Sequence, residues 1–354
     1  MLSPKTRKKI RVLVVDDSAI VRQVLSRELS NTDDIEVVGT APDPYIARDK
    51  IIQLMPDVMT LDVEMPRMDG ITFLRKIMKY NPIPTIVVSS LTPQGSDMAL
   101  DALAAGAVDV LCKSGAAYSV GEVALVLADQ IRAAARIDMS KMQSLSDQVR
   151  KQAPVLIKSL RKTTHKIIAI GASTGGTVAI EAVLRSMPAN CPGIVMVQHM
   201  PESFTKAFAE RLNALCAPEI REAKEGDRVL PGLVLLAPGN SHMRLARDGA
   251  VYCVKMDQGP RLHYQRPAVD CLFDSVADFA GANVVAALLT GMGKDGAAGL
   301  LHIREAGGRT IAQDEKSSVV WGMPGEAVRL GAAEFILPLD RVASQTLDLI
   351  ESIS

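Results

Sequence analysis

A serine flanked by glycines is the first candidate for chemistry in this 354-residue sequence. Residues 171–175 read GASTG and satisfy G-x-S-x-G, a pattern whose glycines permit a sharp turn that exposes the central hydroxyl, here that of Ser173. The strand-like run Lys166–Ile170 precedes the turn, and a helix-like run follows at about 176–187. A helix N-terminus beside the serine would stabilise negative charge on a substrate oxygen. The pattern therefore favours nucleophilic catalysis by Ser173.

The same glycines are also compatible with a dinucleotide-binding loop, because a strand, a glycine-rich turn and a helix N-terminus form an anion site. G-x-G-x-x-G requires glycine where Ser173 stands. It also requires an acidic residue after a second strand about 20 residues on, where Gln198 and His199 occur instead. Both differences count against an oxidoreductase, and a cofactor-binding assay would separate the two hypotheses.

A nucleophilic serine needs a base and an orienting carboxylate. His199 follows a strand-like run, and Asp295 follows the apolar run Val284–Leu289, so both residues share with Ser173 a position after a strand. Doubly wound sheets keep their sites at this edge. Two alternatives stay open: His242 also follows a strand-like run and could be the base, and Asp295 could be a helix N-cap.

A second set of reactive side chains lies in the first half of the chain. Asp16 and Asp17 follow one apolar run, Asp62 follows another, and Ser89 and Lys113 follow two more. Three carboxylates in one place repel one another unless a cation is bound, and oxygen ligands suit Mg²⁺. An aspartate beside the metal could attack a phosphoryl donor. Taken alone, a pair of aspartates after a strand is typical of a helix-capping turn, so the convergence of four strand ends carries this interpretation.

The elements that must position these residues alternate along the chain. Apolar runs at 10–15, 35–39, 58–61, 85–88 and 107–111 alternate with helix-like stretches near 19–30, 44–54, 70–79 and 95–105 and from about 119 onward. This alternation predicts a parallel sheet with helices on both faces, in a flavodoxin-like (βα)5 domain. The second half repeats the pattern, so we predict a doubly wound, mostly parallel α/β domain there as well.

Length and composition indicate two globular domains. Hydrophobic residues make up 48% of the chain, and 40 basic residues balance 40 acidic ones, which argues against a general nucleic-acid binder. A helix-prone but increasingly polar stretch is broken at Pro154. We therefore predict one domain at 1–130, a linker at 131–163 and a second domain at 164–354.

The cysteines and the apolar runs indicate a location. The five cysteines show no zinc-ligand spacing and fit a reducing compartment. No run approaches the ~18 consecutive apolar residues of a transmembrane helix, and the apolar run at 12–15 is too short for a signal peptide. The expected location is the cytoplasm.

The first half resembles the receiver domain of two-component response regulators. The motifs are VVDDS at 14–18, LDVEMPRMDG at 61–70, VSSLT at 88–92 and LCKSG at 111–115, and the resemblance covers about residues 9–130. It implies that Asp62 is the phosphoacceptor, that Asp16, Asp17 and Asp62 hold Mg²⁺ with the backbone carbonyl of Glu64, and that Ser89 and Lys113 are the switch residues that contact the phosphoryl oxygens. Many receivers carry an aromatic switch residue where this chain has Val110, so we expect switching without a ring flip.

The second half resembles the chemotaxis protein-glutamate methylesterases, the CheB family. GASTGG at 171–176, QHMP at 198–201 and GMGKDG at 291–296 carry the resemblance, which spans about residues 165–350. It implies that Ser173 is the nucleophile, His199 the base and Asp295 its orienting carboxylate. The backbone N–H of Met292 would contact the oxyanion, with Thr174 assisting.

The two resemblances together imply an activity and its partners. The enzyme would hydrolyse glutamate methyl esters and deamidate glutamines on the cytoplasmic helices of methyl-accepting chemotaxis receptors, using no cofactor for this chemistry. A chemotaxis histidine kinase would donate the phosphoryl group that activates it. Neither nucleic-acid binding nor membrane insertion is expected. A transcription factor is the alternative for a receiver protein, but its output domain would be small and helical with a basic recognition helix.

Overall fold

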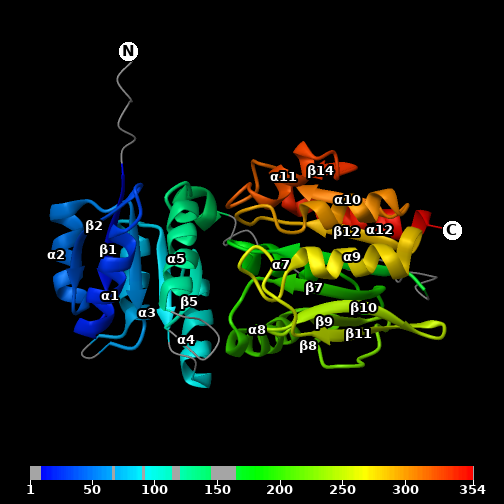
Figure 1. The fold of residues 1–354 in the computed structure, drawn as a ribbon, viewed down its shortest axis with the longest axis horizontal. Coiled ribbons are helices and arrows are strands. Elements are labelled where there is room, and N and C mark those ends of the chain that lie inside the picture. Colours follow the sequence, from blue (N-terminus) through cyan, green and yellow to red (C-terminus); the bar gives the residue numbers. More distant parts are fainter. Residues whose placement is uncertain (1–8, 66–67, 90–91, 114–119, 145–164, 354) are drawn as a thin grey trace, which may run out of the picture. The chain divides into compact units, whose positions relative to one another are not determined.

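The computed structural model describes residues 9–65, 68–89, 92–113, 120–144 and 165–353. The chain divides into two compact units, Met1–Met139 and Ser140–Ser354, whose elements are labelled in Figure 1. Helix α5 (Val120–Ala134) continues four residues past the predicted domain end at 130. Most of the predicted linker, residues 145–163, lies outside the described residues.

The first unit is built on a five-stranded parallel sheet with the strand order β2-β1-β3-β4-β5. The strands are β1 (Ile10–Val15), β2 (Ile35–Ala41), β3 (Val58–Asp62), β4 (Thr85–Ser89) and β5 (Asp109–Cys112). The helices are α1 (Ala19–Ser30), α2 (Pro44–Leu54), α3 (Gly70–Tyr80), α4 (Pro93–Ala104) and α5 (Val120–Ala134). This strand order is that of the flavodoxin-like fold, so the predicted fold class is confirmed.

Short polar side chains start the helices of this unit. Asp43 accepts hydrogen bonds from the N–H groups of Tyr45 and Ile46, and Asp69 accepts one from Thr72 N–H at 2.8 Å. Such caps satisfy backbone donors that have no partner inside the helix. The central strands β3 and β4 are buried along their whole length, as expected for a parallel sheet covered on two sides, whereas the edge strand β2 is partly exposed.

The second unit contains a seven-stranded sheet in which every neighbouring pair is parallel, with the order β14-β13-β12-β6-β7-β9-β8. Its strands are β6 (Ile167–Ala172), β7 (Gly193–Gln198), β8 (Glu219–Glu222), β9 (Leu233–Leu236), β12 (Val284–Leu288), β13 (Arg309–Gln313) and β14 (Phe335–Leu337). A separate antiparallel hairpin consists of β10 (His242–Asp248) and β11 (Val251–Asp257). The predicted mostly parallel α/β fold is thus confirmed here too.

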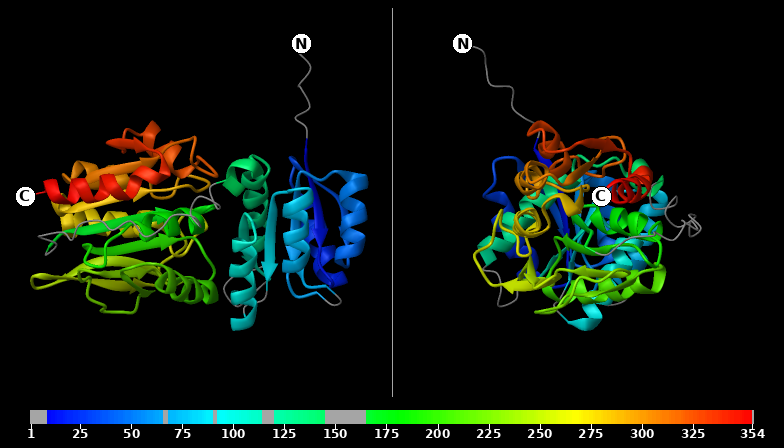
Figure 2. Two further views of the ribbon diagram at one scale, coloured as in Figure 1. Left: turned by 180° about the vertical axis from the view of Figure 1, so that it is seen from behind. Right: turned by 90° about the vertical axis from the view of Figure 1, so that its right-hand side faces the viewer.

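Helices cover both faces of the second sheet. They are α7 (Gly176–Arg185), α8 (Glu202–Leu215), α9 (Val269–Ala280), α10 (Ala297–Glu305), α11 (Met323–Arg329) and α12 (Leu339–Ser352). Helix α9 lies in front of the sheet in Figure 1, whereas α12 comes to the front when the unit is seen from behind in Figure 2. Helix α9 packs on α10 and the hairpin, while α12 packs on α7. Between α9 and the sheet lies a core that includes Ile167, Val195, Leu235 and Phe273.

The strand order changes direction at β6. This strand pairs with β7 on one side and with β12 on the other, so the chain winds outward from β6 in one direction first and in the other later. Ligands of doubly wound sheets bind at such a switch point, beyond the carboxyl ends of the strands. Among the described residues, no helix is long and apolar enough to cross a membrane.

Candidate active site and phosphoacceptor site

Ser173 lies in the tight turn between β6 and α7. Its N–H donates to the carbonyl of Thr290 at 3.0 Å, and its carbonyl accepts from Gly176 N–H at 2.6 Å. Gly175 has a φ of 78°, and a Cβ there would lie 2.6 Å from the Cβ of Val319. The turn therefore needs glycine at this position both for its backbone angle and for its packing. It holds Ser173 just before the N-terminus of α7.

His199 joins the serine to a buried carboxylate. It follows β7, with Nδ1 at 3.1 Å from Ser173 Oγ and Nε2 at 2.8 Å from Asp295 Oδ2. Because an ionised carboxylate only accepts, Nε2 carries a proton and the neutral ring presents Nδ1 as the acceptor toward the serine. In the chymotrypsin triad the two nitrogens have the opposite roles, with Nε2 facing the serine.

Asp295 follows β12 and its side chain is buried. Its carboxylate accepts from Val269 N–H at 2.7 Å and from Asp270 N–H at 2.9 Å, the first donors of α9. Burial alone raises the pKa of Asp295, but the hydrogen bond from His199 and the backbone N–H groups hold that pKa below its ordinary value. The residue is therefore ionised at neutral pH. It caps α9, whereas the helix after it, α10, has Gly296 at its N-cap.

The loop that carries Met292 lies against the serine. A Cβ at Gly291 would lie 2.8 Å from the Cβ of Ser173 and 2.2 Å from Met323 Sδ. The carbonyl of Gly291 is turned away, since it accepts from Gly322 and Met323 N–H at 3.0 and 2.8 Å. Among the described residues the N–H of Met292 donates to no backbone carbonyl. A backbone N–H group thus lies one residue after Gly291, where the loop packs against Ser173.

Thr174, the other residue expected to assist the oxyanion, is buried beside the same loop. Its carbonyl lies 3.0 Å from the hydroxyl of Thr290, which ties the serine turn to the end of β12.

Gln198 also belongs to this site, although no role in it was predicted from the sequence. Its side-chain Nε2 lies 3.0 Å from the carbonyl of Ser173 and 3.1 Å from that of His199, so one buried amide ties both backbones. A Cβ at Gly176 would lie 2.1 Å from Gln198 Oε1. The glycine at position 176 is therefore explained by packing against Gln198, without a bound phosphate. The available signal was a polar residue at the end of an apolar strand.

His242, the alternative base, has a different environment. Its Nδ1 accepts from Ala268 N–H at 3.1 Å, and its Nε2 donates to the carbonyl of Pro260 at 3.0 Å. Burial lowers the pKa of this imidazole. Both ring nitrogens are thus committed to the backbone, and the geometry favours His199 as the base.

The first unit brings its predicted acidic residues together. Carboxylate oxygens of Asp16, Asp17 and Asp62 lie within 4.8 Å of one another. Lys113 Nζ is 2.5 Å from Asp62 and 2.9 Å from Asp16. Burial raises the pKa of Asp62 to about 6, against the opposing effect of Lys113. A cluster of carboxylate oxygens with one exposed member, Asp17, is a donor set that fits Mg²⁺.

The other predicted residues of this site lie around the cluster. Glu64 N–H donates to Asp62 Oδ1 at 3.0 Å, which places the Glu64 backbone beside the phosphoacceptor candidate. Ser89 is buried at the end of β4 and donates its hydroxyl hydrogen bond to the carbonyl of Gly95 in α4, at 3.1 Å. Val110 is buried on β5. A rearrangement at Ser89 would therefore reach α4 directly.

Family models match both units. The response regulator receiver domain matches residues 12–120, and the CheB methylesterase matches residues 168–346. A protein-glutamate methylesterase/protein-glutamine glutaminase of Syntrophus aciditrophicus is 54% identical over 342 residues, 97% of this chain and 99% of its own length. One from Bdellovibrio bacteriovorus is 50% identical over 350 residues, 97% and 98% of the two chains. The crystal structure of the Thermotoga maritima CheB methylesterase catalytic domain matches with a TM-score of 0.51 and 35% identity, covering 55% of this chain and all of that one.

Proposed function

Because the chain belongs to the CheB methylesterase family and carries a response regulator receiver domain, we propose that Ser173, His199 and Asp295 perform its ester hydrolysis. The protein is a carboxylic ester hydrolase, a protein-glutamate methylesterase and protein-glutamine glutaminase of chemotaxis adaptation. The observation that carries the proposal is the hydrogen-bonded series from Ser173 Oγ through His199 to Asp295, at 3.1 and 2.8 Å.

The first half of the reaction forms an acyl-enzyme. Ser173 Oγ attacks the carbonyl carbon of the glutamate side-chain ester while its proton passes to Nδ1 of His199. Asp295 stabilises the resulting imidazolium through the Nε2 hydrogen bond. The negative charge on the former carbonyl oxygen is stabilised by the N–H of Met292, assisted by Thr174 in the turn before α7. Collapse of this intermediate breaks the C–O bond, and the departing methoxide takes the proton from Nδ1 and leaves as methanol.

The second half releases the product. Water gives a proton to Nδ1 of His199 and attacks the acyl carbon, and the proton then returns to Ser173 Oγ as the free glutamate side chain leaves. A glutamine side chain presents the same carbonyl, and ammonia replaces methanol as the leaving group. The chain itself supplies the nucleophile, the base and the oxyanion donor, which supports an esterase that uses no cofactor.

The receiver is proposed to be phosphorylated on Asp62. Asp16, Asp17, Asp62 and the Glu64 carbonyl would hold Mg²⁺, which when bound neutralises the crowded carboxylates and the phosphoryl oxygens. Lys113, now paired with Asp62 and Asp16, would contact an oxygen of the acyl phosphate, and Ser89 another. We propose that this phosphorylation activates the esterase.

The proposed partners follow from the two domains. The phosphodonor is a chemotaxis histidine kinase, and the substrates are glutamyl side chains on the cytoplasmic helices of methyl-accepting receptors. The proposed domains remain 1–130 and 164–354 with a linker at 131–163, in a protein of the cytoplasm.

The test is methanol release from methylated receptor. Ser173→Ala should lower turnover by several orders of magnitude, up to about 10⁶-fold, because the serine and its base act as one unit. Ser186→Ala is the matched control, since Ser186 lies at the other end of α7. Turnover of Ser173→Ala close to that of the control would refute the covalent mechanism. An inactive His242→Ala beside an active His199→Ala would refute the choice of base.

A further inference from the structure

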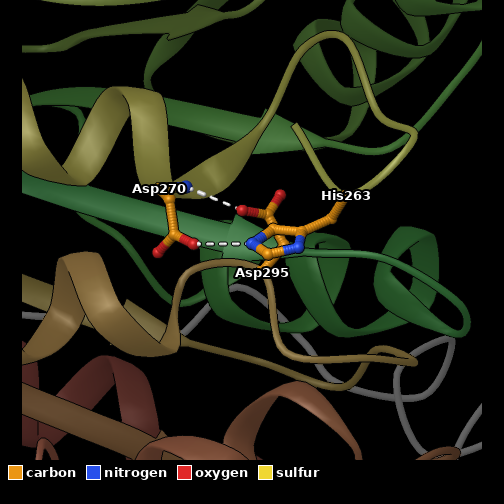
Figure 3. A group of neighbouring side chains, drawn as sticks. All are labelled: His263, Asp270 and Asp295. Atoms are coloured by element: carbon orange, nitrogen blue, oxygen red, sulfur yellow. Dashed lines mark hydrogen bonds and ion pairs between the residues drawn. The ribbon is translucent and has the colours of Figure 1, made fainter. Parts of the chain in front are cut away.

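A two-residue turn lies beside the carboxylate end of the site (Figure 3). Leu262 and Gln265 exchange backbone hydrogen bonds of 3.1 and 2.8 Å across it. The two residues at its tip, His263 and Tyr264, have φ angles of 51° and 62°. Such angles favour glycine or asparagine, and two adjacent larger side chains adopt them only where their surroundings hold them there.

Several contacts hold the turn in place. The guanidinium of Arg266 donates to the carbonyls of Gln258 and Gly259 at 3.1 and 3.0 Å and to Asn240 Oδ1 at 2.7 Å. The buried imidazole of His242 donates to Pro260 at the base of the same loop. These hydrogen bonds fix the position of the loop that carries the turn.

The turn delivers one side chain to a buried carboxylate. His263 Nε2 lies 3.3 Å from Asp270 Oδ2, and Figure 3 shows the imidazole beside both Asp270 and Asp295. One ligand-type atom from each of these three residues lies within 4.8 Å of the others. The turn therefore places the imidazole of His263 beside the two carboxylates next to His199.

Asp270 is linked to Asp295 and to a neighbouring helix. It lies in the first turn of α9, its own N–H donates to Asp295 Oδ1 at 2.9 Å, and its Oδ1 accepts from Gly299 N–H in α10 at 2.8 Å. Its side chain is buried. Burial and the nearby charge of Asp295 raise the pKa of Asp270 to about 6. At neutral pH two carboxylates therefore lie side by side away from water.

The other charged groups around Asp270 come from several elements. His263 faces it from the turn and Asp295 from the loop after β12. Asp274 lies one helical turn along α9 and is itself paired with His302 of α10 at 2.7 Å. Strand β10 contributes Arg244, whose guanidinium lies 3.4 Å from the carbonyl of Cys271. From these elements, His263 is the side chain that hydrogen-bonds the carboxylate of Asp270.

We propose that Asp270 and His263 are positioning residues of the esterase. Asp270 supports Asp295 through its backbone N–H and its negative charge, and the hydrogen bond from His263 favours the ionised form of Asp270. This role rests on the proposed function of Ser173, His199 and Asp295. A second negative charge beside Asp295 further stabilises the imidazolium that His199 becomes in the transition state. Removing that charge should therefore disfavour the protonated form of His199 relative to the wild type.

The central experiment compares Asp270→Asn with the wild type in full-length protein, measuring kcat and KM for methylated receptor across the acidic and neutral range. Asparagine keeps the oxygen that accepts from Gly299 and removes the charge. We expect kcat to fall about 3- to 10-fold with KM nearly unchanged, because a charge a few ångströms away is partly screened. The acid limb of kcat/KM should move to a pH lower by about 0.5 to 1.

His263 is tested through Asp270. His263→Gln removes the imidazole, and we expect a loss of about 2- to 5-fold near neutral pH. The double variant should behave as Asp270→Asn alone, because His263 acts through that carboxylate. His302→Gln is the matched control, since it breaks an exposed histidine–aspartate pair on the neighbouring helices and should change nothing.

Two outcomes would overturn the inference. An acid limb that stays in place in Asp270→Asn would show that its charge does not reach His199, and additive losses in the double variant would show that His263 acts elsewhere. If Asp270→Asn fails to fold, as judged by circular dichroism, an unchanged pH profile in His263→Gln alone would still refute the proposal. If Ser173→Ala is inactive while one of these outcomes is found, the positioning proposal fails but the proposed function of Ser173 stands. The failure of one proposal can thus be distinguished from the failure of the other.

Discussion

Replacing Asp62 with asparagine should stabilise the receiver unit at neutral pH in the absence of divalent cations. The carboxylate is 1% exposed and lies beside that of Asp16, so its ionised form is costly, and its pKa rises to about 6. A tenfold change in an ionisation constant corresponds to about 1.4 kcal/mol, so ionising Asp62 in the folded state costs about 3 kcal/mol relative to the unfolded chain. Asparagine avoids this cost and keeps an oxygen for Glu64 N–H.

The net gain should be smaller than that cost. Lys113 loses its 2.5 Å partner in the variant and keeps Asp16 at 2.9 Å, so part of the advantage is offset. We therefore expect the free energy of unfolding of the unit to rise by about 1–2 kcal/mol at neutral pH.

The pH dependence has a definite sign. The pKa of Asp62 is higher in the folded than in the unfolded state, so its contribution to stability is complete below its unfolded pKa and is lost as pH rises through about 6. The wild type and Asp62→Asn should thus be nearly equal in stability at about pH 4. They should diverge up to about pH 7 and keep a constant difference above it.

The difference in the free energy of unfolding can be measured in the full chain by hydrogen exchange of the buried amides of β1 and β3, because these amides report unfolding of the first unit. Asp49→Asn, which changes an exposed aspartate, should stay within about 0.5 kcal/mol of the wild type. Added Mg²⁺ should stabilise the wild type and have less effect on Asp62→Asn. A variant less stable than the wild type at neutral pH, or a difference independent of pH, would refute the reasoning.

Three further results are expected. Asp295→Ala should lower kcat for methanol release by about 10⁴-fold, less than the serine or histidine variants, because it acts by orienting His199; an equal loss would contradict that role. Gly291→Ala should lower kcat at least about tenfold in a folded protein, since its Cβ would lie 2.8 Å from that of Ser173; normal kcat would show that the loop can move aside. A small phosphodonor should label the wild type with Mg²⁺ present, but neither the chelated protein nor Asp62→Asn, and a labelled variant would place the phosphoacceptor elsewhere.

Much of the architecture could be predicted because parallel strands covered on both faces are continuous apolar runs. The run predicted at 10–15 is the strand Ile10–Val15, and the helices predicted near 19–30 and 44–54 have those bounds. The strand predicted at 107–111 instead begins at Asp109 and ends at Cys112. Its predicted start was wrong because Ala107 and Val108, which precede the strand, are also apolar and buried, so hydrophobicity alone could not locate its first residue.

The residues that hold the site in place were harder to find. Gln198 and Asp270 are each 25 residues from the residue that they hold, and His263 contacts Asp270 from a different element, so their roles depend on contacts that residue types alone do not reveal. For His242 the sequence left two roles open. Its hydrogen bonds to Pro260 and Ala268 favour the structural one.

Residue type and position relative to the strands determined which side chains are available for chemistry, because the carboxyl ends of parallel strands meet at one edge of a sheet. This rule is enough to place Ser173, His199, Asp295 and Asp62 at the edges of their sheets from the sequence alone. Only the tertiary structure decided that Nδ1 of His199 faces the serine, and that Asp295 caps α9. It also decided that His263 hydrogen-bonds the carboxylate of Asp270. Hydrogen bonding and desolvation act over a few ångströms between residues distant in the chain, and the sequence does not contain those distances.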